Sequence, residues 1–459
     1  MTTARNEKHN DVPTNAMKTK DLYKAVWRWH FYAGLIFMPF LLILAITGGI
    51  YLFKSEIEQF MYQDFYQVEA QGQVISPSKQ IETVMDRYPE ANVDRYRPGE
   101  DTHRSAEVGI INDSSSLTVF VNPYTGEIVG ELHDEERLMN KIEEIHGELM
   151  AGTTGDRMVE LAACWALILI VTGIYLWRPK RNEKLWGTLL PRFSKGKNVL
   201  RRDLHAVPAF WISAGMFFLI ITGLPWSGLW GNGVQHLATN TGVGYPPSIW
   251  IGEAPTSDVK TEDVADVSWA AENLDVPSSA IQEYERLSID DVVAIAKERN
   301  VYPSYDVFFP KEADGVYTLS VFPPKAEDEA TIHIDQYTGA VLADYRFQDY
   351  GPAGKMIAMG ITLHKGSQFG LINQLAGLII CIGIVGVVVS GFYLWWKRKP
   401  NGELGAPKAP ANKTMKSLTF ILLLLGVLFP LVGISLIFVW MIDFLLIKRT
   451  PKLKKFLNA

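Results

Sequence analysis

The apolar residues of this chain are gathered into long stretches, with polar segments between them. Each of four stretches has few charges and enough length, about 20 residues, to cross the roughly 30 Å hydrocarbon core of a bilayer as a helix. These stretches are 26–53, 158–177, 206–226 and 371–396. The pattern predicts a membrane protein that crosses the bilayer several times.

A fifth apolar stretch, 417–447, has Pro430 and Gly433 near its middle and allows two interpretations. One long helix would carry the basic tail KRTPKLKKF to the outer side. Two short helices, 417–431 and 433–447, would return the tail to the cytoplasm. We favour the hairpin because cytoplasmic segments carry an excess of Lys and Arg.

The distribution of charge sets the expected orientation. Segments 178–202 and 397–416 are crowded with Lys and Arg, whereas 55–155 and 229–369 are rich in Asp and Glu. The positive-inside rule places the basic segments in the cytoplasm and the acidic segments outside. The first 25 residues lack the apolar core and cleavage site of a secretory signal, so we expect the first span to be an uncleaved anchor.

The chain repeats one unit twice. "RWHFYAGLIFMPFLLILAITG" (28–48) matches "DLHAVPAFWISAGMFFLIITG" (203–223), and each has a histidine near its start and a Thr-Gly pair at its end. "IHGELMAGTTG" followed by "VTGIYLW" likewise matches "LHKGSQFG" followed by "VSGFYLW". The sequence therefore predicts two outgoing and two returning spans in equivalent positions.

The two acidic segments also repeat. Each opens with an amphipathic helical pattern and continues with alternating strand patterns that share the turn Asn/Asp-x-Tyr-Thr-Gly, where Gly126 and Gly339 supply a permissive backbone. We expect each segment to form a small α+β domain, with a helix on an antiparallel sheet. His333 alternates along one such strand and is expected at the surface.

Four histidines occupy equivalent places in the two repeats. His30 and His205 lie near the inner ends of the outgoing spans, and His146 and His364 precede the returning spans. An ionisable side chain at membrane depth is costly and usually faces the bundle interior. Glycines between each outer histidine and its span predict a bend that brings the ring back to the membrane edge. We therefore expect one pair of histidines at each membrane face.

Two neutral imidazoles across a flat apolar gap are the ligands of a six-coordinate b-type haem. The alternatives are a metal or proton path and purely structural histidines. Zinc is less favoured because it usually takes three or four clustered ligands, and neither Cys164 nor Cys381 stands in a zinc or haem-attachment motif. Cationic candidates for the haem propionates, each of which could instead be an ordinary interfacial residue, are Arg28, Arg178, Arg201 and Arg202 inside and Arg157 and Lys365 outside.

These motifs together resemble the PepSY-associated transmembrane proteins, which include bacterial inner-membrane ferric-siderophore reductases and iron-regulated membrane proteins. The resemblance rests on "WHFYAG" with "ITGGIYLF", "NPYTGEIVG", "HGELMAGTTG" with "VTGIYLW", and their second copies, over about residues 20–400. It implies a helical membrane bundle of four core transmembrane helices in two repeats, with two extracytoplasmic α+β PepSY-like domains. It also implies two b haems, which we carry onto His30 with His205 and His146 with His364.

The expected boundaries follow from these spans and segments. They are 1–25 cytoplasmic, 26–54 first span, 55–145 first periplasmic domain, 146–178 second span, 179–202 cytoplasmic loop, 203–228 third span, 229–362 second periplasmic domain with an insertion, 363–397 fourth span, 398–416 cytoplasmic loop, 417–447 hydrophobic hairpin and 448–459 cytoplasmic tail.

The favoured function is a membrane oxidoreductase that passes electrons from the inner to the outer haem and reduces a periplasmic acceptor, by resemblance a ferric siderophore. No Gly-rich dinucleotide loop follows a predicted strand, so quinol or a separate reductase is the expected donor. We expect no nucleic-acid partner. One alternative is a non-redox PepSY protein that binds or regulates a periplasmic partner such as a protease. A transporter is another, although its polar sites would lie nearer the membrane midplane.

Overall fold

The computed structural model describes residues 14–112, 115–178, 187–241, 243–244, 256–279, 285–407, 420–421 and 423–458. The predicted N-terminal segment 1–25, the loops 179–202 and 398–416 and the hairpin 417–447 therefore fall partly outside the described residues. The chain divides into two compact units. Unit 1 comprises 1–46, 156–220 and 380–459, and unit 2 comprises 47–155 and 221–379.

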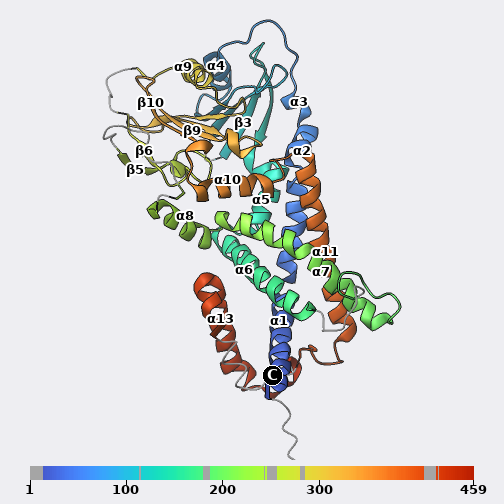
Figure 1. The fold of residues 1–459 in the computed structure, drawn as a ribbon. Helices are drawn as coiled ribbons and strands as arrows, with labels where there is room; N and C mark the ends of the chain where they lie inside the picture. Colours follow the sequence, from blue (N-terminus) through green and yellow to red (C-terminus); the bar gives the residue numbers. More distant parts are fainter. Residues whose placement is uncertain are drawn as a thin grey trace, which may run out of the picture. The chain divides into compact units, whose positions relative to one another are not determined.

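Helices account for most of the described residues (Figure 1). The α-helices are α1 Thr14–Tyr51, α2 Lys54–Met61, α3 Gln63–Tyr66, α4 Pro77–Arg87, α5 Leu138–Glu148, α6 Gly152–Trp177, α7 Lys197–Gly223, α8 Trp230–Thr241, α9 Ile289–Glu298, α10 Pro352–His364, α11 Leu371–Arg398, α13 Pro430–Ile442 and α14 Pro451–Leu457. Among the described residues, five helices are long and apolar enough to cross a membrane, within Asp21–Tyr51, Gly152–Trp177, Lys197–Trp226, Leu371–Arg398 and Pro430–Ile447.

The chain breaks before each returning span, as the glycine pattern predicts. In the first repeat, α5 ends at Glu148, and Leu149 and Met150 adopt positive φ values of 52° and 57° before α6 begins. In the second repeat, α10 ends at His364, and Gly366 and Gly370 have φ values of 82° and 58° before α11 begins. Each outer histidine therefore lies on a short helix of its own, separate from the long apolar helix that follows.

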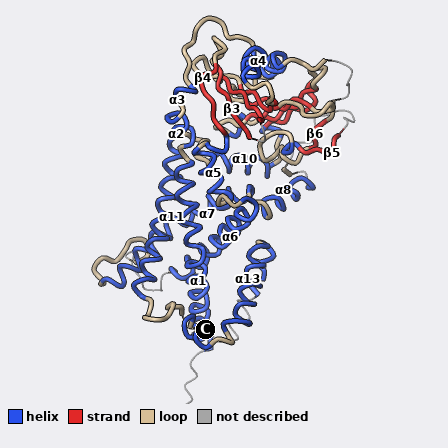
Figure 2. The backbone as a smooth tube through the Cα atoms, turned by 180° about the vertical axis from the view of Figure 1, so that it is seen from behind, coloured by secondary structure: helices blue, strands red, loops and turns tan. Residues whose placement is uncertain are grey.

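Unit 2 contains one large antiparallel sheet (Figure 2). Its strand order is β10-β9-β8-β7-β1-β2-β3-β4. The strands are β1 Asn92–Arg97, β2 Ala106–Asn112, β3 Ser115–Val121, β4 Ile128–His133, β7 Asp306–Phe308, β8 Val316–Val321, β9 Ala330–Asp335 and β10 Val341–Arg346, and a separate pair is formed by β5 Thr256–Lys260 and β6 Asp275–Pro277.

The two acidic segments thus share a sheet, whereas the sequence predicted a separate sheet for each. Strand β1 of the first segment pairs with β7 of the second, with Arg95 opposite Phe308 and Tyr96 opposite Val307. Joining at these strands removes two exposed sheet edges, which would otherwise present unpaired backbone groups. The symmetric strand order on either side of the β1–β7 seam preserves the predicted duplication.

One face of the sheet carries the hydrophobic core. The helices α4 and α9 lie side by side over this face (Figure 1). Val84 of α4 and Val292 of α9 are buried among strand residues such as Val108, Leu319 and Ile332. Ser78 near the start of α4 donates its backbone N–H to the Asp290 carboxylate of α9 at 2.9 Å, which links the two helices directly.

The other face of the sheet is polar but also buried, and this corrects the prediction for His333. The side chains of successive strand residues point to opposite faces of a sheet, so His333 lies on the face opposite to the one that carries Ile332. Its side chain is fully buried and contacts Thr318 Oγ1 through Nδ1 at 3.0 Å. Burial lowers the pKa of His333 to about 4, so the ring is neutral at physiological pH.

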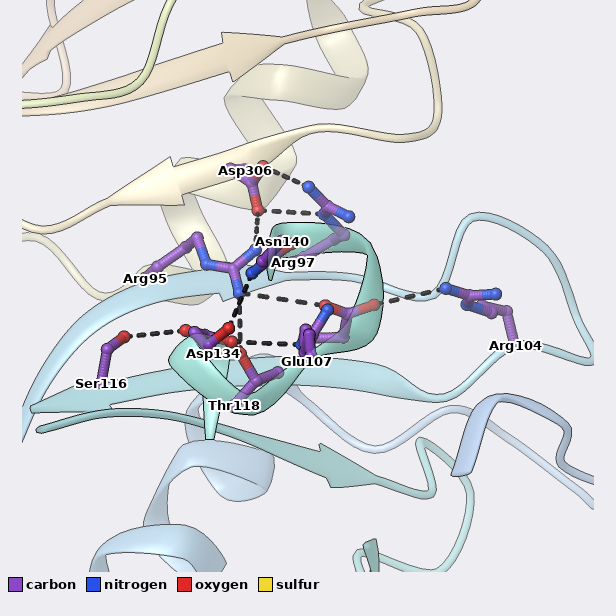
Figure 3. A network of polar contacts seen from close by, with 10 residues as sticks. Arg95, Arg97, Arg104, Glu107, Ser116, Thr118, Asp134, Asn140 and Asp306 are labelled. Atoms are coloured by element: carbon purple, nitrogen blue, oxygen red, sulfur yellow. Dashed lines mark hydrogen bonds and ion pairs between the residues drawn. The ribbon is translucent and has the colours of Figure 1, made fainter. Parts of the chain in front are cut away.

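Buried charges lie at the seam (Figure 3). Asp306 of β7 accepts from Arg95 Nη1 at 2.8 Å and from Arg97 Nε at 2.9 Å, and both arginines belong to β1. Arg95 also lies 3.9 Å from Glu107 of β2, which Arg104 approaches to 3.3 Å. Burial alone would raise the pKa of Asp306, but Arg97 and Arg95 together hold it below its usual value.

The C-terminal segment of unit 1 turns back on itself. A Cβ on Gly426 would lie 2.8 Å from Cα of Gly433, whereas seven residues of continuous helix span about 10 Å. The reversal occurs at Phe429, just before α13. After α13 the chain reaches α1, where Tyr32 donates its hydroxyl to the Leu457 carbonyl at 2.6 Å. This course fits the hairpin interpretation, and the side of the membrane on which the tail lies stays a prediction.

Candidate functional site

In unit 2 the rings of the two outer histidines lie next to each other in an edge-to-face arrangement. His146, near the end of α5, and His364, the last residue of α10, have ring centroids 6.3 Å apart and planes inclined by 72°. Each histidine lies close to the end of a short helix, just before the backbone break. The direction of its ring is therefore set by the short helix rather than by the membrane helix that follows. The sequence predicted this pairing from the repeat alone.

The separation of these rings matches that of two axial ligands of one metal ion. A metal–imidazole nitrogen bond of about 2 Å, together with the distance from nitrogen to ring centre, separates two opposed ring centroids by about 6 Å. The pair therefore fits bis-histidine ligation, and the haem itself stays a prediction.

Each outer ring is held by a Thr-Gly pair on a membrane helix. Thr47 Oγ1 of α1 lies 2.9 Å from His146 Nδ1, and a Cβ on Gly48 would come within 3.1 Å of Cε1 of the same ring. Thr222 Oγ1 of α7 lies 3.1 Å from His364 Nδ1. A Cβ at the next residue, Gly223, would again lie 3.1 Å from the ring's Cε1.

The inner histidines of unit 1 follow the same arrangement on other helices. His30 Nδ1 of α1 contacts Thr172 Oγ1 of α6 at 2.9 Å. A Cβ on the next residue, Gly173, would lie 3.2 Å from Cε1 of the His30 ring. His205 Nδ1 of α7 contacts the Val387 carbonyl of α11 at 3.0 Å and Ser390 Oγ at 3.3 Å. Gly391 lies against the His205 ring in the same way.

These contacts fix the tautomers of the inner rings. The Val387 carbonyl can only accept, so Nδ1 of His205 carries the proton and donates it. Thr172 directs its own hydroxyl proton to the Ile168 carbonyl at 2.7 Å, which leaves its oxygen to accept from His30 Nδ1. Nε2 of each ring then presents its lone pair, the form that binds a metal, and such outer hydrogen bonds typically orient metal-binding histidines.

Sequence reasoning missed the role of these glycines. A helical period groups Gly34 and Gly48 on the face of α1 that carries His30, but Gly34 contacts Leu169 and Gly48 lies against the His146 ring. The signal was present in the repeat. A Thr-Gly or Ser-Gly pair occurs once for each histidine, at 47–48, 172–173, 222–223 and 390–391.

The predicted propionate partners have other contacts in the structure. Arg28 donates to the carbonyls of Pro407 at 2.5 Å and Asn458 at 2.9 Å, which gives it an anchoring role for the C-terminal segment. The remaining contacts are Arg157 with Asp156 at 2.8 Å, Arg201 over the Tyr393 ring at 5.8 Å, Arg202 with Asp203 at 3.2 Å and Lys365 over the Phe322 ring at 5.9 Å. Arg178 is exposed. A role beside haem propionates stays a prediction for all six.

A charged cluster flanks the outer pair within unit 2. Glu143, three residues before His146, accepts from the Tyr51 hydroxyl at 2.9 Å and from Lys54 Nζ at 3.2 Å. Burial alone would raise the pKa of Glu143, but Lys54 and Lys365 hold it below its usual value. The outer histidines are thus bordered by ionised groups that fix the local charge.

Comparison with known proteins identifies the family of the chain. No curated protein gives a significant match to the chain. The family model described as the PepSY-associated TM region matches residues 27–398, from the start of the first apolar stretch through the end of α11. The match includes all four histidines and their Thr-Gly or Ser-Gly partners. The chain is therefore a membrane protein of the PepSY-associated transmembrane family.

Proposed function

We propose that this chain is a di-haem b-type electron-transfer protein of the bacterial inner membrane that reduces a periplasmic ferric chelate, in the first place a ferric siderophore. The observation that carries the proposal is the His146–His364 pair, with its 6.3 Å centroid separation. A purely structural role would not require two histidine rings at this separation. It would also not require a glycine beside each ring or a hydroxyl group within hydrogen-bond distance of each Nδ1. Membership of the family supports the membrane setting.

Bound haem would supply one-electron chemistry at each pair. His30 with His205 and His146 with His364 would hold the two haems. Hydrogen bonds at Nδ1, with Thr at three of the rings and with the Val387 carbonyl and Ser390 at His205, would leave Nε2 for the iron. One electron converts iron(III) in the chelate to iron(II), which hard oxygen ligands hold more weakly, and iron is released. Quinol or a separate reductase loses that electron on the other side, since the sequence offers no dinucleotide-binding loop.

The finer placement of the chain belongs to the same proposal. We infer that α1, α6, α7 and α11 form the four core membrane helices. The two halves of the sheet then correspond to two PepSY-type domains in the periplasm. The basic residues of 187–202 and 448–458 favour a cytoplasmic position, whereas the acidic composition of the sheet segments favours the outside.

The absorption spectrum of the purified, dithionite-reduced protein tests the proposal. We expect a reduced b-haem band, and His364→Ala should lose the outer haem and about half of the bound haem. His236→Ala is the matched control, because His236 is an exposed histidine of α8 in the same unit. Reoxidation of the reduced protein by ferric chelates then identifies acceptors.

A well-folded but colourless wild-type protein would refute the redox proposal. The chain would then be better described as a non-redox membrane protein that binds a periplasmic partner. Retention of the full haem content by His364→Ala would refute the ligand assignment and leave the histidine pair without a redox role.

A further inference from the structure

A cavity of about 320 Å³ lies in unit 2 and is lined by residues that follow α7 and by residues of the segment 262–272. We call it the acidic tryptophan pocket and define it by Trp226, Gln235, Glu262, Asp266, Trp269 and Glu272. Its volume is at the lower end of the range for small-molecule sites, about 300–1,000 Å³. It can therefore enclose one arm of a chelate rather than a whole complex.

The pocket adjoins the outer histidine pair along the chain. Pro225, which lines it, follows Gly223 by two residues, and Gly223 is the glycine against the His364 ring. Trp269 donates its indole N–H to the Pro225 carbonyl at 3.3 Å, which ties the far wall of the pocket to the same turn. A ligand in the pocket would thus lie beside the polypeptide turn that positions His364.

The chemistry of the lining selects a cation. Three carboxylates line the pocket, from Glu262, Asp266 and Glu272, and no Lys, Arg or His is among its described lining residues. Two indole rings complete the walls, and the faces of such rings attract ammonium and guanidinium groups. A positively charged organic group would satisfy both kinds of wall.

The negative charges of the carboxylates that line the pocket also repel one another. Burial raises the pKa of Glu272 to about 7, Gln235 opposes this rise through a 2.8 Å hydrogen bond, and the charges of Glu262 and Asp266 add to it. Burial likewise raises the pKa of Asp266, which interacts electrostatically with Lys365 and Glu143. Lys365 directly follows His364, and Glu143 precedes His146 by three residues.

We propose that the acidic tryptophan pocket binds the cationic arm of the electron acceptor, an ammonium or guanidinium group on a ferric chelate. The identity of the ligand as an electron acceptor rests on the proposed function, whereas selective binding of a cationic arm does not. The pocket then sets substrate charge, and chelates with a positive arm are preferred over otherwise identical neutral or anionic ones.

Binding is best tested with chelates that cannot be reduced. A linear trihydroxamate is neutral around a trivalent metal, so its terminal amine, N-acetyl and N-succinyl forms carry net charges of about +1, 0 and −1 at neutral pH. Gallium(III) complexes of the three are titrated into the full-length protein in detergent and followed by tryptophan fluorescence and equilibrium dialysis. We expect the amine form to bind at least tenfold more tightly than the succinyl form.

Glu262→Gln/Glu272→Gln should lower affinity for the amine form by about tenfold or more and leave the succinyl form unaffected or slightly improved. Glu82→Gln/Glu90→Gln is the matched control, since it removes two exposed carboxylates of the same unit. Equal affinities for the three charges, or an unchanged affinity in the pocket variant, would overturn the inference.

The two proposals fail separately. A colourless protein that still binds the amine form selectively supports the cationic pocket and refutes the redox function. A protein that contains haem but reduces the three iron(III) complexes at equal rates, and binds their gallium(III) forms equally, refutes the pocket and retains the redox function.

Discussion

The substitution Asp306→Ala tests whether buried charges hold the two halves of the sheet together. Asp306 accepts hydrogen bonds from both Arg95 and Arg97 across the β1–β7 seam, at 2.8 Å from Arg95 Nη1 and 2.9 Å from Arg97 Nε (Figure 3). Backbone pairing at the seam is short, since β7 comprises only Asp306–Phe308. Side-chain contacts therefore contribute a large share of the local stability.

The expected loss follows from what the substitution leaves behind. Removing one partner of a buried ion pair typically costs about 3–5 kcal/mol, because the remaining charge stays desolvated. The Arg95 and Arg97 side chains are 18% and 32% exposed, so water partly solvates them, and Glu107 still faces Arg95 at 3.9 Å. We therefore expect the lower end, about 3 kcal/mol. A tenfold change corresponds to about 1.4 kcal/mol, so local opening should become about 100-fold more frequent.

Hydrogen exchange measured by mass spectrometry resolves this effect, because it reports opening of individual segments. Amides of β1 and β7 should exchange about 100-fold faster in Asp306→Ala, while those of α1 and α11 should not change. Asp275→Asn is the control: its pair with Lys260 is 45% and 41% exposed, and such surface pairs contribute about 0–1 kcal/mol.

The pH dependence has a definite sign. The pKa of Asp306 is depressed in the folded protein, so its contribution is complete above the unfolded value of about 4 and is lost as pH falls through the folded value. The difference between wild type and Asp306→Ala should therefore shrink in acid. Seam exchange that is unchanged by the substitution, or a difference that grows in acid, would contradict this account of the seam.

Two further predictions concern histidines in unit 2. Thr222→Val removes the hydroxyl 3.1 Å from His364 Nδ1 and should weaken haem retention about 10–100-fold, whereas Thr222→Ser should restore it; equal haem loss rates in the two variants would exclude an orienting hydrogen bond. His333 is buried with its pKa lowered to about 4, so the unfolded chain takes up a proton first as pH falls below about 6.5. Wild type should lose up to about 1.4 kcal/mol per pH unit between those values, and denaturant titrations of His333→Asn should show a flatter profile; parallel profiles would refute it.

The membrane helices could be predicted from sequence because apolar runs of about 20 residues leave few alternatives. The breaks at Leu149 and Gly366 could be predicted as well, since glycines between a histidine and an apolar run mark a bend. Pairing of β1 with β7 could not. Asn92–Arg97 and Asp306–Phe308 lie some 200 residues apart, are short and carry charged residues, so no local pattern indicates that they meet.

Periodicity tells which residues share a face but not what covers that face. This is why His333 was wrongly expected at the surface: the alternation along β9 was correct, yet polar side chains on that face are buried. It is also why the glycine partners were missed. A helical period groups Gly48 with His30 on α1, but the ring that approaches Gly48 comes from α5.

The positions of the Thr-Gly pairs explain why two outgoing helices carry a histidine at the same place. The helix α1 supplies His30 and, 17 residues later, the Thr47–Gly48 pair that receives His146; α7 supplies His205 and, at the same spacing, the pair that receives His364. Each outgoing helix therefore provides one histidine and one Thr-Gly pair that contacts an outer histidine. The returning helices α6 and α11 provide the Thr-Gly and Ser-Gly pairs that contact the inner histidines. Without the glycine, a Cβ would keep the imidazole ring from coming within hydrogen-bond distance of the hydroxyl. Without the hydroxyl, the ring would lose the hydrogen bond that orients its Nδ1. Because both features recur at all four rings, in two separate units, close packing of ordinary helices does not account for them; this recurrence supports the proposal that the four rings are oriented as metal ligands.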